Sequence, residues 1–304
     1  MPEMNEFPPG LPSWADLASP SLDESVSFYR ELFGWEAQES ENAEETGGYQ
    51  TFLKDGKRVA GVAPIQNEGT PPSWNTYIAV SDADEIAGKV KEAGGEVIAE
   101  PMDVMDLGRM AFFADPTGAA FGVWQAKEHK GADLVSEPGA PAWHQVNTRD
   151  PEKAQEFYEA VFGWDNERVD TGGADYWEWN LDGTPVGGMF RMGEDFPDDV
   201  PPHWIVFFAV EDTDQATEAA KEKGAQVRAE PVDTEAGRFS VMTDPHGAAF
   251  AVITQPDRGE AGGDSDETED RDQGKEDGGE DEEPRAERDQ GEDGEGEEGD
   301  EEDR

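Results

Sequence analysis

Hydrophobic positions along the chain recur first with the period of a strand and then with that of a helix. A strand is predicted at residues 14–18, and a helix from the capping-box sequence at 21–24 to a stop at Gly34. Short strands follow at about 49–53 and 59–65, joined by a Lys-Asp-Gly-Lys turn. This order of one strand, one helix and short strands is interpreted as a βαβββ unit, of whose three closing strands two are located in the sequence.

The same order returns in the next part of the chain. A strand at 74–80 leads into a helix that ends at the glycine pair 94–95, and strands follow near Val97, at 110–114 and at 121–125. The last two are joined by an Asp-Pro-Thr-Gly turn. A second βαβββ unit is therefore predicted.

Both units are duplicated. The segment at 14–35 reappears at 143–164 with a constant spacing of 129 residues, and the later sequence DPTGAAF reappears as DPHGAAF. Spacings drift only between predicted elements, where insertions are tolerated. We therefore predict an α+β chain of two tandem domains, each of two βαβββ units, at residues 10–127 and 139–255 with a linker at 128–138.

Residues 256–304 have a different composition. They contain 25 Asp or Glu against 6 Lys or Arg, and no aromatic or aliphatic residue except alanine. Such a self-repelling segment cannot bury a core and is predicted to be a disordered acidic tail. It is interpreted either as a solubilising segment or as an interaction arm for a basic partner.

Composition also limits the partners of the first 255 residues, which carry 48 acidic and 17 basic residues. This charge repels nucleic-acid phosphates and anionic membranes, so both are excluded as partners. Cysteine is absent, which excludes disulfides and thiolate chemistry. The N-terminus does not have the pattern of a secretion signal, and the apolar run at 204–210 is too short to span a bilayer, so a cytoplasmic protein is expected.

Three features together resemble a known family: FYRELFGW after a short strand, a second strand and helix ending in Gly-Gly, and a closing DPxG hairpin. They resemble the vicinal oxygen chelate superfamily, which includes glyoxalase I, extradiol dioxygenases and bleomycin-resistance proteins. The details are most similar to its two-domain glyoxalase-like members from actinobacteria. The resemblance implies a small-molecule ligand in a cleft formed by two βαβββ units. Four units in one chain favour a monomer, with a dimer as the alternative.

The resemblance also implies where a metal would bind. In the metal-dependent families His, Gln or Glu ligands lie on the first strand, on the strand that opens the second unit and on the last strand. The corresponding residues here are Trp14, Asn75, Gly122, Trp143, Ile205 and Ala251. None supplies an imidazole or a carboxylate, so neither a metal nor a cofactor is expected.

Strand alternation places mostly aromatic side chains on the face of the cleft. The candidate ligand-binding residues are Trp14, Asp16, Tyr77, Trp124, Trp143, Gln145 and Phe207. Two interpretations stay open. The tryptophans form a slot for a flat or apolar molecule, or they simply fill the interior.

Histidines add little to this prediction. His144 is expected to point away from the cleft, His129 lies in the linker and His246 lies in a turn. His203 shares a face with Ile205, and a register shift of two residues brings it into the second cleft.

No catalytic residue is identified, because the chain has no Ser-His-Asp arrangement and no phosphate-binding glycine loop. Arg109 and Arg238, at equivalent positions, are expected to pair with carboxylates. The expected function is metal-free binding of an apolar or aromatic metabolite or drug. The alternatives are a lyase, isomerase or oxygenase of the same superfamily, and a non-catalytic protein that uses its acidic tail for interaction.

Overall fold

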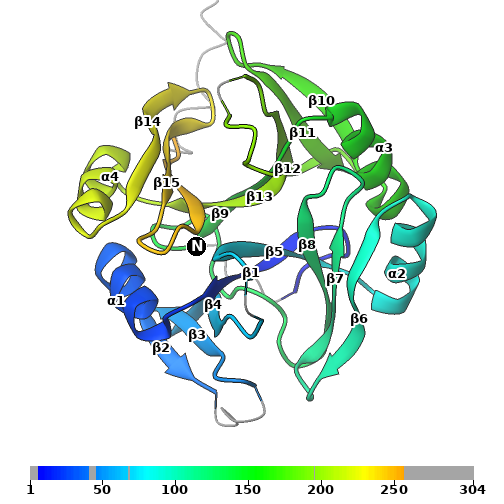
Figure 1. The fold of residues 1–304 in the computed structure, drawn as a ribbon, viewed down its shortest axis with the longest axis horizontal. Coiled ribbons are helices and arrows are strands. Elements are labelled where there is room, and N and C mark those ends of the chain that lie inside the picture. The colour runs from blue at the N-terminus through cyan, green and yellow to red at the C-terminus, as the bar shows by residue number, and fades with distance from the viewer. Residues whose placement is uncertain (1–5, 41–45, 68, 195, 257–304) are drawn as a thin grey trace, which may run out of the picture. The chain divides into compact units, whose positions relative to one another are not determined.

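The computed structural model describes residues 6–40, 46–67, 69–194 and 196–256. These residues belong to one compact unit and form two eight-stranded mixed sheets with four helices (Figure 1). No helix within the described ranges is long and apolar enough to cross a membrane. The predicted tail lies outside the described residues, apart from Pro256.

The first domain forms one sheet with the strand order β2-β3-β4-β1-β5-β8-β7-β6. Its elements are β1 (Pro12–Ser19), α1 (Leu22–Phe33), β2 (Glu36–Glu39), β3 (Gln50–Lys54), β4 (Lys57–Pro64), β5 (Ser73–Ala79), α2 (Ala83–Glu92), β6 (Glu96–Val104), β7 (Gly108–Ala114) and β8 (Ala120–Ala126). The opening strands of the two units, β1 and β5, pair antiparallel at the centre. The other strands of the first unit extend to one edge of the sheet and those of the second unit extend to the opposite edge, as two βαβββ units require.

The second domain repeats this order as β10-β11-β12-β9-β13-β16-β15-β14. Its elements are β9 (Pro141–Thr148), α3 (Pro151–Phe162), β10 (Asp165–Asp170), β11 (Asp175–Leu181), β12 (Thr184–Arg191), β13 (His203–Ala209), α4 (Thr213–Glu222), β14 (Gln226–Thr234), β15 (Gly237–Thr243) and β16 (Ala249–Thr254). The predicted α+β fold of two tandem domains, each of two βαβββ units, is confirmed.

One local prediction is wrong. Helix α1 is followed by the C-cap Gly34 with φ 70°, which is the predicted stop, but Ser21 makes no side-chain cap hydrogen bond. The Ser21 backbone N–H instead donates to Ser19 Oγ at 3.0 Å. The capping box at 21–24 is therefore not formed.

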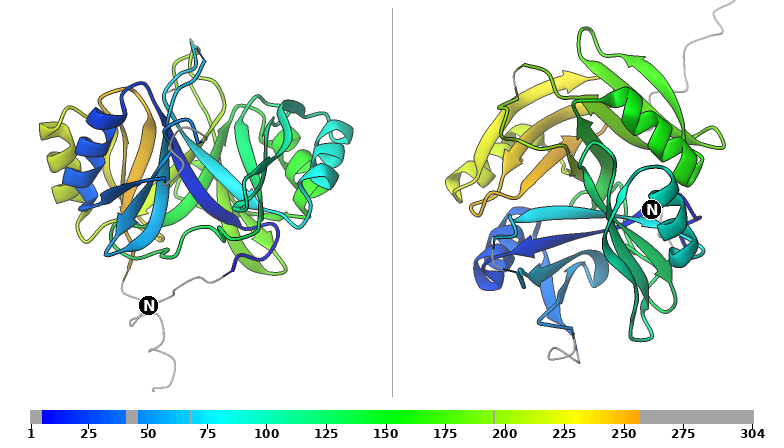
Figure 2. Two further views of the ribbon diagram at one scale, coloured as in Figure 1. Left: turned by 90° about the horizontal axis from the view of Figure 1, so that it is seen from below. Right: turned by 45° about the vertical axis from the view of Figure 1, so that its right-hand side comes forward.

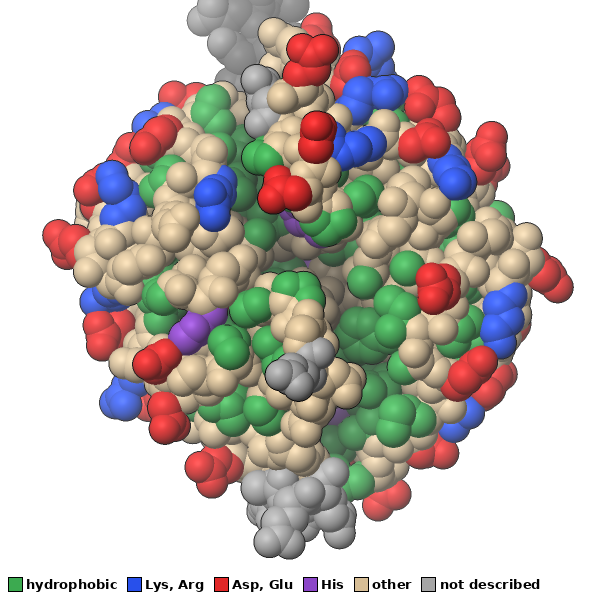
Figure 3. Space-filling model, viewed as in Figure 1, with side chains coloured by type: hydrophobic (Ala, Val, Ile, Leu, Met, Phe, Trp, Pro, Cys, Tyr) green, Lys and Arg blue, Asp and Glu red, His purple; other side chains and the backbone are tan. Residues whose placement is uncertain are grey.

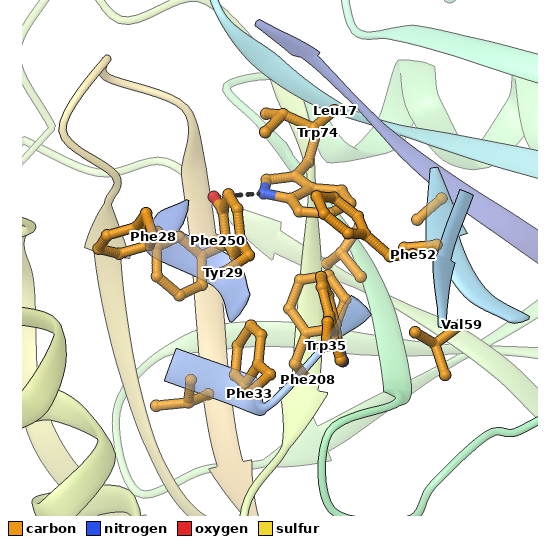
Figure 4. Close-up of a cluster of buried hydrophobic side chains, with 14 of the residues drawn as sticks. Leu17, Phe28, Tyr29, Phe33, Trp35, Phe52, Val59, Trp74, Phe208 and Phe250 are labelled. Carbon is orange, nitrogen blue, oxygen red and sulfur yellow. Dashed lines mark hydrogen bonds between the residues drawn. The ribbon is translucent and has the colours of Figure 1, made fainter. Parts of the chain in front are cut away.

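Each large hydrophobic core contains side chains from both domains. In the first core, Tyr29 and Trp35 of the first domain pack with Phe208 and Phe250 of the second (Figure 4). The second core joins α2 and its strands to α3 and its strands in the same way. Figures 1 and 2 accordingly show α1 beside α4 and α2 beside α3.

Two equivalent hydrogen bonds cross between the domains inside these cores. The Tyr29 hydroxyl donates to Asp244 Oδ2 at 3.1 Å, and the Tyr158 hydroxyl donates to Asp115 Oδ2 at 3.0 Å. Burial and the nearby Asp244 charge raise the pKa of Tyr29 well above its ordinary value, so the hydroxyl stays a neutral donor. Each tyrosine therefore links a helix of one domain to the DPxG turn of the other.

Candidate ligand-binding site

Each curved sheet turns one face away from the helices. On β1, Trp14 and Asp16 lie on this face, while Ala15 and Leu17 are buried in the helix-side core. We call the following set the first concave face: Trp14, Asp16, Tyr49, Asn75, Tyr77 and Trp124. Pairing of Trp14 with Tyr77 across β1 and β5 brings the predicted residues of the first domain together.

Glycines make room for aromatic rings on this face. A Cβ atom at Gly122 would lie 2.5 Å from the Tyr77 ring, and one at Gly61 would collide with the Tyr49 hydroxyl. The space at Gly122, one of the metal-ligand positions implied by the family, is therefore filled by the Tyr77 ring.

Asp16 is the centre of a buried polar network. Its carboxylate accepts hydrogen bonds from Asn75 Nδ2 at 2.9 Å and from the Tyr77 hydroxyl at 2.8 Å, and it is also bonded to the Tyr49 hydroxyl. Tyr49 in turn accepts from Trp14 Nε1 at 2.8 Å. Burial raises the pKa of Asp16, although the hydrogen bonds act in the opposite direction. The hydroxyl protons of both tyrosines are thus used inside the network.

This pKa shift has a measurable consequence. The folded state holds the Asp16 proton more tightly than the unfolded state does, so ionisation of Asp16 lowers stability as pH rises above about 3.9 through the raised folded-state pKa. The Asp16→Asn variant does not ionise at this position, so we expect its stability relative to that of the parent to increase over this rise in pH. The difference between the denaturation midpoints of the two proteins measures this change.

The control is Asp103→Asn. The hydrogen bond and charge of Lys127 lower the pKa of Asp103, so this variant is expected to lose stability relative to the parent as pH rises. A pH-independent difference between the parent and Asp16→Asn would contradict the expected role of burial.

The linker covers part of the first concave face. The sequence did not predict this contact. The His129 ring centroid lies 4.5 Å from that of Trp14 and 5.5 Å from that of Trp124, and its carbonyl accepts from Trp124 Nε1 at 2.7 Å. An ion pair between Arg58 and Asp133 at 2.6 Å holds the linker to the start of β4. Burial and the nearby Arg58 charge lower the pKa of His129 to about 4. No local pattern predicts this contact, because it depends on where β8 ends relative to β1.

The second domain presents the equivalent set, which we call the second concave face: Trp143, Gln145, Asn147, Tyr176, His203 and Phe207. Trp143 Nε1 donates to the Tyr176 hydroxyl at 2.9 Å, as Trp14 does to Tyr49. A Cβ atom at Gly188 would collide with the Tyr176 hydroxyl, so Gly188 corresponds to Gly61. The predicted residues Trp143, Gln145 and Phe207 therefore lie together.

A row of polar side chains crosses the second concave face. Gln145 Nε2 donates to Asn147 Oδ1 at 2.7 Å, Asn147 Nδ2 lies 3.0 Å from His203 Nε2, and His203 Nδ1 lies 2.8 Å from the carbonyl of Pro201. His203 pairs with Asn147 across β13 and β9. It therefore reaches this face without the register shift considered from the sequence.

The two faces differ in exposure. Trp14 and Asp16 are buried, at 5% and 6% exposed, whereas Trp143 and Gln145 at the equivalent positions are half-buried. Figure 3 shows hydrophobic side chains in the hollowed parts of the molecule and most charged side chains around its outer edge.

The residues present do not fit a divalent metal. The six positions named from the family carry aromatic, amide, aliphatic or no side chains. Within the part of the chain that the structure describes, no group of three His, Cys, Asp or Glu residues is placed to hold a metal ion. Asp16 is already bonded to three protein groups, so it does not offer a free ligand.

The remaining sequence predictions concern structural contacts. His144 points away from the concave face and bonds to Thr76 Oγ1 at 2.9 Å, where burial lowers its pKa to about 3. Arg109 pairs with Asp84 at 2.9 Å and Arg238 with Asp214 at 2.7 Å. The expected orientation of His144 and the expected ion pairs are confirmed.

Comparisons with known proteins agree with this architecture. Residues 12–123 match the family described as the Glyoxalase/Bleomycin resistance protein/Dioxygenase superfamily, and residues 143–253 match a glyoxalase-like domain. The chain is 42% identical over 266 residues to the anthracycline biosynthesis protein DauV of Streptomyces sp. (strain C5), covering 82% of this chain and 95% of DauV. It is 42% identical over 258 residues to the putative glyoxylase CFP32 of Mycobacterium tuberculosis, covering 83% and 98% of the two chains.

Solved structures share the fold at much lower identity. The 2,3-dioxygenase LapB from Pseudomonas sp. KL28 superposes with a TM-score of 0.57 at 15% identity, covering 82% of this chain and 94% of LapB. The Mn(II)-bound glyoxalase from Novosphingobium aromaticivorans gives 0.56 at 16% identity, covering 81% and 82%.

The fold is that of a protein with two tandem glyoxalase-like domains. The chain belongs to the Glyoxalase/Bleomycin resistance protein/Dioxygenase superfamily, as the match of family models to both domains shows.

Proposed function

We propose that the protein binds a small, flat, apolar or aromatic molecule on its concave faces, without a metal ion. The observation that carries this proposal is the replacement of the implied metal ligands by an aromatic face with a few fixed polar groups. Ligand sites of proteins commonly combine an apolar lining with a small number of polar groups that orient the ligand. Two relatives are named anthracycline biosynthesis proteins, which supports a polycyclic aromatic ligand for this chain.

The first test is the metal content of the purified protein. We expect no stoichiometric Mn, Fe, Ni or Zn, because the ligand positions lack imidazole and carboxylate groups. Elemental analysis after dialysis without chelator measures this directly. About one metal ion per chain that survives dialysis would contradict the proposal.

The second test is a panel of aromatic metabolites and antibiotics. Binding is expected to raise the melting temperature and to quench tryptophan fluorescence, because Trp143 lies on the proposed site. If no compound of a broad panel binds, the binding function is wrong, whatever the metal content.

A further inference from the structure

We propose that the ligand occupies the second concave face, where it donates a hydrogen bond to Gln145 Oε1 and accepts one from the Tyr176 hydroxyl. Its class is then a flat aromatic molecule that carries both a hydroxyl and a carbonyl group. This assignment rests on the proposed function and adds to it the face that is used and the polar groups that the ligand must carry.

The order of donors and acceptors along the polar row of the second concave face leaves Gln145 Oε1 as an unused acceptor among the described residues. The carbonyl of Pro201 can only accept, so His203 Nδ1 carries the proton. Burial lowers the pKa of His203, so the ring is neutral at pH 7 and its Nε2 accepts from Asn147 Nδ2. Asn147 Oδ1 then faces Gln145 and accepts from its Nε2. Gln145 Oε1 remains without a partner among the described residues.

Tyr176 supplies the complementary donor. Its oxygen accepts from Trp143 Nε1 at 2.9 Å, and its own proton has no acceptor within the described part of the chain. Burial raises the pKa of Tyr176 to about 12, so the hydroxyl keeps this proton at neutral pH. The hydroxyl lies over Gly188, which pairs in register with Gln145. The free donor and the free acceptor therefore lie in the same part of the face.

The first concave face lacks this arrangement. Its hydroxyl groups at Tyr49 and Tyr77 both bond to Asp16, so the polar network is satisfied within the protein. His129 also packs on Trp14. An additional polar ligand would have to break one of these buried hydrogen bonds, which is costly. On the second face, the positions equivalent to Trp14, Asp16 and Tyr77 carry Trp143, Gln145 and Phe207. Within the described ranges, Gln145 Oε1 and the Tyr176 proton have no hydrogen-bond partner there.

The test uses the full chain and two probes of the same size and flatness, 7-hydroxyflavone and 7-methoxyflavone. Both are aromatic ketones, but only the first can donate a hydrogen bond from position 7. Dissociation constants are measured by tryptophan fluorescence and calorimetry. We expect the parent to bind 7-hydroxyflavone at least about 5-fold more tightly than 7-methoxyflavone, which is the effect of one hydrogen bond.

Two variants remove the proposed contacts. Tyr176→Phe and Gln145→Leu are each expected to weaken binding of 7-hydroxyflavone by about 5- to 10-fold, and Gln145→Leu is expected to abolish the preference over 7-methoxyflavone. The matched control is Tyr49→Phe on the first face, which is expected to change binding by less than about twofold. Thermal melts without ligand identify any variant that does not fold, and the two variants test different atoms of the same site.

Equal losses for Tyr49→Phe and Tyr176→Phe would overturn the assignment to the second face. Equal affinity of the parent for the two flavones would overturn the role of Gln145 Oε1. If the parent binds other aromatic compounds of the panel but neither flavone, the ligand class assigned here is wrong while the proposed function stands.

Discussion

Neither half of the chain is expected to fold as a monomer when residues 6–138 or 139–256 are produced alone. Each large core depends on side chains from both halves, such as Phe33 against Phe208 and Phe28 against Phe250. Separation exposes these rings to water, at a cost of about 25 cal/mol per Å² of apolar surface. It also removes the partners of the buried Tyr29 and Tyr158 hydroxyls. Circular dichroism and amide NMR spectra are expected to show an unfolded chain or a self-associated one.

The control for this experiment is co-production of the two fragments. We expect the pair to associate and to recover a cooperative thermal transition, because all interdomain contacts are then available. Residues 6–256 in one chain provide the reference. A fragment that melts cooperatively as a monomer would show that one domain is sufficient for folding.

Trp14→Ala is expected to reduce mainly stability, and Trp143→Ala is expected to reduce mainly ligand binding. Trp14 is 5% exposed and contacts Tyr77, Trp124 and His129, so its truncation is expected to lower the free energy of unfolding by about 3–5 kcal/mol. Trp143 is half-buried and loses fewer contacts. Its truncation is expected to weaken binding of an aromatic ligand about tenfold or more, because a stacking surface is removed.

Denaturant unfolding and ligand titration on the same samples separate these effects. Comparison of the variants at a fixed distance below their melting temperatures removes the contribution of partial unfolding. If Trp14→Ala weakens binding more than Trp143→Ala and leaves stability unchanged, the first concave face is the ligand site. Gain of binding by Trp14→Ala, with no binding by the parent, would instead show that the tryptophans only fill the interior.

Strand alternation predicted several side chains of each concave face, but it did not identify Tyr49, Asn147 or Tyr176. Trp14 and Asp16 share a face with Tyr77 because successive side chains of a strand alternate between its two sides. The end of the first helix could also be predicted from the local sequence, because Gly34 adopts a left-handed conformation that glycine accommodates without strain. The capping box failed because the Ser21 side chain makes no bond to the helix, and its backbone is held instead by Ser19.

The sequence by itself determined the duplicated βαβββ order, part of the side chains that face away from the helices and the lack of metal ligands at the family positions. These features depend on local periodicity and on residue identity, both of which are carried along the chain. Only the tertiary structure decided that the cores are shared between domains and that His129 returns to Trp14. It also decided that the hydrogen bonds of one concave face close on Asp16, whereas on the other face Gln145 Oε1 and the Tyr176 proton have no partner among the described residues. Such contacts join residues far apart in sequence, and their existence depends on the distances that the packed sheets impose.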